Sequence, residues 1–118
     1  MNKDYVSFDD NRIKLATDID AYPDFTELVA SFYGPCLSCL IQNNSNARVL
    51  ISYDGITPHD YLMSMAGDES KLYLNFCRYP NNFKAAIPKG KGIYLSLPAW
   101  GIPKVRTGYI SYSGIIKL

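Results

Sequence analysis

The sequence predicts an all-β fold: an antiparallel β-sandwich of jelly-roll-like or Ig-like type, or a small barrel, with an N-terminal arm. Short apolar runs alternate with polar residues at the period of two that a half-buried strand requires. Gly, Pro and Asn, which favour turns, separate these runs. Tyrosine, with ten Tyr against five Phe and one Trp, is a strand-favouring residue. We therefore expect an arm at residues 1–24 and one sandwich domain at residues 25–118.

The first elements are short. Residues 12–17 allow a strand with Ile13 and Leu15 on one side, and residues 18–24 form a loop closed by Tyr22-Pro23, because the residue before proline avoids helix. Residues 25–33 allow two structures. Their apolar residues have helical spacing with Asp24 as a cap, but they also suit a strand that ends at Gly34-Pro35. We favour the strand, since every later element is β.

From Cys36 onward the pattern is regular. It predicts six strands, at residues 36–43, 47–53, 71–77, 92–97, 106–112 and 114–118. The polar cluster at residues 43–46 separates the first two, so we expect a β-hairpin over residues 40–55. Residues 56–70 make a long connection in which Leu62, Met63 and Met65 allow a helical turn, and residues 78–86 form another loop.

Charge is unevenly placed, although the net charge is only +1. Residues 1–27 hold seven acids and three bases, and the rest of the chain holds four acids and nine bases. Two interpretations stand: an acidic segment folded back on its own domain, or an arm that docks on a basic neighbour. The nine bases are scattered, so we expect no specific nucleic acid as a partner.

Membrane and export signals are not expected either. No apolar run approaches the roughly 20 residues of a membrane span, and the first ten residues lack an apolar signal region. Three cysteines, an odd number, fit a reducing compartment better than a disulfide framework.

The pair Cys36-x-x-Cys39 matches half of a zinc or redox motif. A zinc site needs about four ligands, and only Cys77 and His59 remain to complete one. On a regular strand, Cys36 and Cys39 point to opposite faces. We therefore expect buried, inert cysteines and no metal or other cofactor.

Two further motifs resemble catalytic elements. His59 with Asp60 or Asp54, and Ser64 or Ser52 as nucleophile, would form a hydrolytic set, but no Gly-x-Ser-x-Gly elbow is present. Residues 89–92, Lys-Gly-Lys-Gly, lack the spacing of a phosphate-binding loop and suit a turn that starts a strand. We expect a protein that is not an enzyme.

Exposed aromatic residues are the candidates for binding. Trp100 lies between two prolines and a glycine, and it serves equally well as a contact anchor or as a plug at one end of the sandwich. The residues that we expect to contact partners are Tyr5, Phe8, Tyr61, Tyr79 and Trp100. The alternative function is a carbohydrate-binding module in which Trp100 and loop tyrosines stack on sugars, with Asp54, Asn81 or Asn82 as hydrogen-bond partners.

The order of motifs carries a resemblance. Leu-Ile-Gln-Asn at residues 40–43 and a polar turn precede Arg-Val-Leu-Ile-Ser-Tyr-Asp-Gly at residues 48–55. Ile-Pro-Lys-Gly at residues 87–90 then leads into an apolar strand, and a Gly-bounded strand closes the pattern at residues 108–114. Over residues 37–56 and 87–114 the chain resembles small all-β structural proteins of tailed bacteriophages.

The resemblance implies a non-enzymatic virion component, either a capsid decoration or cement protein or a head–tail or tail part. Its partners would be other virion proteins, namely the major capsid or head–tail and tail proteins, and copies of itself in a homo-oligomer. Its location would be the virion, assembled in the host cytoplasm. The resemblance carries over no site residues.

Overall fold

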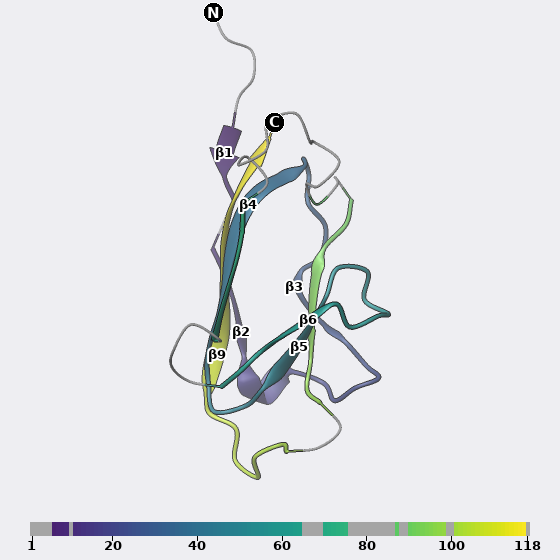
Figure 1. The fold of residues 1–118 in the computed structure, drawn as a ribbon, viewed down its shortest axis with the longest axis vertical. Helices are drawn as coiled ribbons and strands as arrows, with labels where there is room; N and C mark the ends of the chain where they lie inside the picture. The colour runs from purple at the N-terminus through teal and green to yellow at the C-terminus, as the bar shows by residue number, and fades with distance from the viewer. Residues whose placement is uncertain are drawn as a thin grey trace, which may run out of the picture.

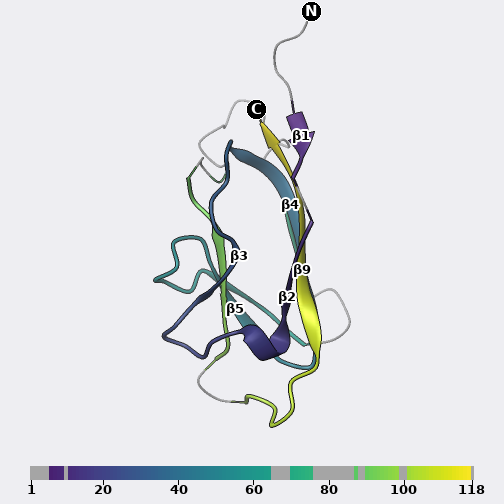
Figure 2. The ribbon, with the colours of Figure 1, turned by 180° about the vertical axis from the view of Figure 1, so that it is seen from behind.

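Two antiparallel β-sheets pack face to face in the computed structural model, which describes residues 6–9, 11–64, 70–75, 87, 90–98 and 101–117 (Figures 1 and 2). The first sheet contains β1 (Val6–Phe8), β2 (Arg12–Leu15), β9 (Gly108–Lys117), β4 (Cys36–Ser45) and β7 (Lys71–Asn75). The second contains β3 (Thr26–Val29), β8 (Ile93–Ser96), β5 (Val49–Ser52) and β6 (Asp60–Leu62). The predicted all-β sandwich is confirmed, and the described strands do not close into a barrel.

The N-terminal strands share one edge of β9. β4 pairs with one edge of β9, and β1 and β2 lie one after the other along its opposite edge. Phe8 lies opposite Ile115, and Ile13 lies opposite Ser111. Between them the main-chain N–H of Asp9 donates to Gly114 O over 2.9 Å. The described residues of the segment expected as an arm are thus built into the sandwich, because β9, ten residues long, offers an edge that these strands pair with.

The chain then returns to the core through a short 3₁₀ turn, η1 (Ala16–Asp18). Ala16, its first residue, and Ile19, which follows it, are buried. The next strand, β3, shows that residues 26–29 of the expected strand at 25–33 are β, and its Val29 pairs with Ile93 of β8.

The connection from β4 to β5 corrects the expected hairpin. β4 pairs with β7 and β9, whereas β5 pairs with β6 and β8, so the chain crosses here from one sheet to the other. Buried Asn43 stabilises the crossing: its Nδ2 donates to Ala47 O at 2.7 Å and Met63 O at 3.1 Å. The sequence pattern gives no sign of this, because two strands that face each other across a core alternate like two paired neighbours.

Two smaller expectations also change. Leu62 ends strand β6, which pairs with β5, and so does not begin a helical turn; Met65 lies outside the described residues. The last two expected strands are one strand, β9, because Gly114 continues the pairing with β4 opposite Cys39. No described helix is long and apolar enough to cross a membrane.

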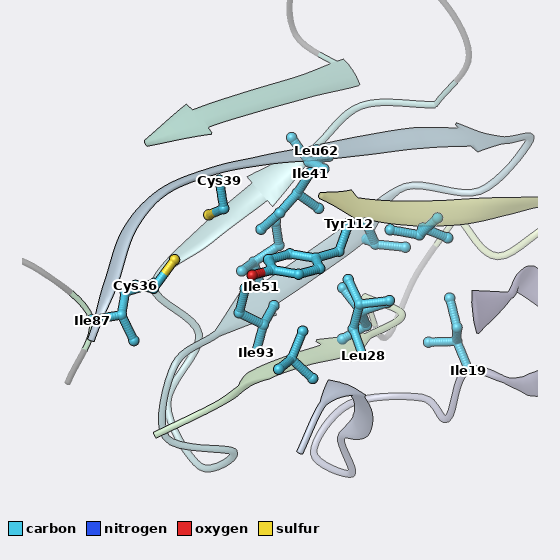
Figure 3. Packing of buried hydrophobic residues seen from close by; sticks show 14 of the residues in the cluster. Ile19, Leu28, Cys36, Cys39, Ile41, Ile51, Leu62, Ile87, Ile93 and Tyr112 are labelled. Carbon is cyan, nitrogen blue, oxygen red and sulfur yellow. The ribbon is translucent and has the colours of Figure 1, made fainter. Parts of the chain in front are cut away.

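The core lies between the sheets (Figure 3). Ile41 of β4 and Tyr112 of β9 face Ile51 of β5 and Ile93 of β8, all fully or almost fully buried. The Tyr112 ring also packs against Phe32, with ring centroids 6.0 Å apart. Alternate residues of β4 and β9 supply this core, so the residues between them point to the opposite side of the first sheet.

Candidate functional site

The candidate site is the side of the first sheet that points away from the core, which we call the outer face; this sheet is the left-hand layer in Figure 1. Residues directly opposite each other on paired strands share a face, so the register defines its members. Its members with described side chains are Phe8, Ile13, Leu15, Ser38, Leu40, Gln42, Asn44, Lys71, Tyr73, Tyr109, Ser111, Ser113 and Ile115.

Strand β2 shows an inverted pattern on this face. Its apolar residues Ile13 and Leu15 are exposed on the outer face, with 62% and 53% of their surface accessible. Its basic residues Arg12 and Lys14 are half-buried and lie opposite the core residues Tyr112 and Ile110. A slip of one residue would reverse this, so the register itself keeps the apolar side chains in solvent.

Other apolar side chains extend the exposed surface across the sheet. Phe8 is 83% exposed at one end of β9, and Tyr73 is 62% exposed on β7, at the opposite edge. Tyr109 is exposed beside Leu15. Five of the eleven large exposed apolar side chains in the described part of the chain therefore lie on one face of one sheet. Exposed apolar side chains gathered on one face are typical of interaction sites.

The outer face is not flat. A hollow of about 330 Å³ is bordered by Phe8, Leu40 and Tyr73, and a second of about 300 Å³ by Ile13 and Tyr109. Asn11 and Ser113 border both, so the two hollows adjoin.

The corresponding side of the second sheet is partly covered by the chain itself. Ser96 of β8 points to that side and is fully buried, and its Oγ donates to Asp24 O over 2.6 Å. The main-chain N–H of Tyr22 donates to Leu97 O over 2.8 Å and holds the same loop in place. On the second sheet the cover lies over β8, and Tyr61 of β6 stays exposed; more of the exposed apolar side chains lie on the outer face of the first sheet.

The contact residues expected from the sequence divide as follows. Phe8 lies on the outer face. Tyr61 is exposed, but it belongs to β6 of the second sheet and is not part of that face. Tyr5, Tyr79 and Trp100 lie outside the described residues.

Sequence reasoning missed Ile13, Leu15, Tyr73 and Tyr109 as candidate contacts. An apolar residue in an alternating strand is normally assigned to the core, and the pattern does not say which side the core is on. The sequence of β2 contains one signal for this exposed side: the residue before Ile13 and the residue between Ile13 and Leu15 are both basic.

The two cysteines correct another expectation. Both Cys36 and Cys39 are buried on the core side of β4, and Figure 3 shows them close to the Tyr112 hydroxyl. The register shifts between Cys36 and Ser38, and this bulge turns both side chains to one side; their assignment to opposite faces is wrong.

The thiols also interact. Their mutual hydrogen bond lowers the pKa of Cys36 and raises the pKa of Cys39, and Cys36 Sγ lies 3.5 Å from Ser38 O, to which it donates. Cys77 lies outside the described residues. Among the described residues, no three His, Cys, Asp or Glu side chains group closely enough to hold a metal ion.

Ser52, Asp54 and His59, which were considered for hydrolysis, stabilise the loop that follows β5. Ser52 is fully buried and its Oγ donates to Asp54 Oδ1 over 2.8 Å, instead of to His59. His59 Nδ1 accepts the main-chain N–H of Tyr53 over 3.1 Å, and its ring stacks on Tyr53. The Ser52 hydroxyl is therefore bonded to the Asp54 carboxylate, and His59 Nε2 lies 4.0 Å from the other oxygen of that carboxylate instead of beside the hydroxyl.

Asp54 organises that loop. The main-chain N–H groups of Thr57 and Ile56 each donate to Oδ1 over 2.8 Å, and with the Ser52 hydroxyl they hold the pKa of this carboxyl well below its usual range. The arrangement is an Asx-type turn that brings the chain from β5 back to β6.

Comparisons with protein-family models, curated proteins and solved structures each found no match for this chain.

Proposed function

We propose that this protein is a non-enzymatic structural protein of a tailed-bacteriophage virion, a capsid decoration or cement protein or a head–tail or tail component. It acts by contacts between subunits, and the outer face of the first sheet is its principal contact surface. The observation that carries the proposal is the register of β2, which exposes Ile13 and Leu15 and keeps Arg12 and Lys14 on the core side.

The outer face leaves apolar surface exposed to water. Each Å² of apolar surface removed from water contributes about 25 cal/mol. A chain that folds alone gains nothing from Ile13, Leu15, Phe8 and Tyr73 on the outside, whereas a subunit in a particle gains that free energy when a neighbour covers them. Such a surface suits a protein whose working state is an assembly.

The choice of a phage virion rests on the resemblance described above. The structure described for residues 37–56 and 90–98 consists of strands and tight connections, with hydrogen bonds that account for the polar residues Asn43, Ser52 and Asp54 as turn and crossing supports. These residues therefore need no catalytic role to explain them, which supports a scaffold over an enzyme.

Mass spectrometry of purified particles from the phage that encodes this chain tests the proposal. We expect the chain among the virion proteins, in copies that match a symmetric position of the particle. Its absence from intact particles would contradict the proposed function. In a parallel glycan-array experiment, binding that is lost on Trp100→Ala would favour the carbohydrate-binding module instead.

A further inference from the structure

We propose that the outer face binds a second copy of this chain, so that two first sheets pack face to face about a two-fold axis lying between them. The inference rests on the proposed function, because it names a partner of the same contact surface. It is argued from the charge, the extent and the shape of that face.

Charge favours a second copy. A two-fold interface places a surface against a copy of itself, so any strong charge near its centre would meet a like charge. Among the described side chains that the register places on the outer face, Lys71 alone is charged, and it lies on β7 at the edge of the sheet. Asp9 and Arg12 also border the two hollows of this face, and their side chains pair with each other at 3.4 Å. The central strands β4 and β9 present Leu40, Gln42 and Ser111 instead. A strongly acidic or basic partner would meet only Lys71 and the mutually paired Asp9 and Arg12 here.

The extent of the face fits a dimer. β9 has ten residues and runs about 33 Å, and four strand widths span about 19 Å, which gives a planar area of roughly 600 Å². Projecting side chains increase the accessible area above the planar value. A stable interface buries about 800 Å² on each partner, so one face approaches the area that a two-fold dimer needs.

The shape of the face fits sheet-on-sheet packing. Two sheets pack about 10 Å apart when apolar side chains from each interdigitate. The outer face offers both parts of such an interface: exposed side chains at Ile13 and Tyr73, and adjoining hollows of about 330 and 300 Å³ between them. In a two-fold dimer each copy contributes side chains and hollows alike.

Sedimentation equilibrium of the full chain tests the inference. We expect a monomer–dimer equilibrium, with no larger species as concentration rises. Ile13→Lys and Tyr73→Lys, at opposite edges of the face, should each weaken the dimer at least about tenfold, because a charge would be buried without a partner. Ile56→Lys is the matched control: Ile56 is 77% exposed but lies in the loop after β5, and this variant should dimerise as the parent does.

Salt provides a second measurement. Because the face is nearly uncharged, the dimer dissociation constant should change less than about threefold between about 0.05 and 0.5 M salt. A strong loss of dimer with salt would show that charged segments elsewhere hold the copies together, and it would contradict the face-to-face interface.

The outcomes separate this inference from the proposed function. A monomer at every concentration up to about 1 mM, where even weak specific contacts are populated, overturns the second copy as partner. If that monomer is still present in particles, the virion role stands and the face binds another virion protein. A dimer that Ile13→Lys and Tyr73→Lys leave unchanged also overturns the inference. A salt-independent dimer sensitive to both variants, but absent from particles, supports the inference and contradicts the virion role.

Discussion

Tyr112 of β9 donates a hydrogen bond from its hydroxyl to Asp9 Oδ2 over 3.1 Å, and both residues are buried. Asp9 lies in the link between β1 and β2, where Arg12 also approaches its carboxylate at 3.4 Å. Burial raises the pKa of Tyr112, so the phenol stays protonated and remains a donor. This contact ties the link between the two N-terminal strands to β9, next to the main-chain pairing whose register turns Ile13 and Leu15 outward.

Removing that donor should weaken the fold. In Tyr112→Phe the buried Asp9 carboxylate loses a charge-assisted hydrogen bond, which costs about 1–3 kcal/mol of unfolding free energy. Urea unfolding measures the loss, with Tyr61→Phe, at an exposed position, as the control. A change below about 0.5 kcal/mol would show that the bond does not hold the N-terminal strands.

Replacing Gly114 by any larger residue should destabilise the fold. A Cβ there would lie 2.3 Å from Tyr112 Oη and 3.0 Å from Ser38 O, so Gly114→Ala should cost about 1–3 kcal/mol. Removing the hydroxyl relieves the closest contact, so Gly114→Ala and Tyr112→Phe together should cost less than their sum. Strict additivity in a double-mutant cycle would contradict this geometry.

The crossing between the sheets depends on Asn43. Asn43→Ala removes the amide that donates to the Ala47 and Met63 carbonyls; Ser45 Oγ still lies 3.0 Å from Ala47 O, but Met63 O loses its Asn43 donor, and we expect a loss of about 1–3 kcal/mol by urea unfolding. Asn44→Ala is the control, since Asn44 is its exposed neighbour on the outer face. Equal effects at both positions would contradict the role assigned to Asn43.

The Asp54 turn makes the stability of the fold depend on pH in the acidic range. The folded-state pKa of Asp54 lies below its unfolded value of about 3.9, so its contribution is present above that pH and is lost as pH falls toward the folded value. The melting temperature of Asp54→Asn should therefore be below that of the parent at pH 7 and approach it below pH 4. A difference that stays constant down to about pH 2 would exclude this linkage.

The sequence predicts the strands well and their partners poorly. Alternation locates β4, β5, β8 and β9 because burial on one side leaves a local pattern. It does not distinguish a hairpin from a crossing between sheets, since that depends on Asn43 reaching carbonyls near residue 63, nineteen and more residues away. Pairing is decided by these distant contacts.

The site was harder still to predict. Phe8 was expected as a contact, and it lies on the outer face. Ile13 and Leu15 were placed together on one side of a strand, which is correct, but the side that faces solvent is known only once β2 is paired with β9. The bulge at Cys36 likewise depends on the opposing strand, and no residue near Cys36 in the sequence predicts it.

The number of copies bound per particle tests the central claim most directly, namely that the outer face is a contact surface between subunits. Quantitative mass spectrometry would compare Ile13→Lys with the control Ile56→Lys in particles assembled with each variant. We predict that Ile56→Lys occupies the particle as the parent chain does and that Ile13→Lys is depleted at least about tenfold. Equal occupancy by the two variants, with both folded, would contradict the account.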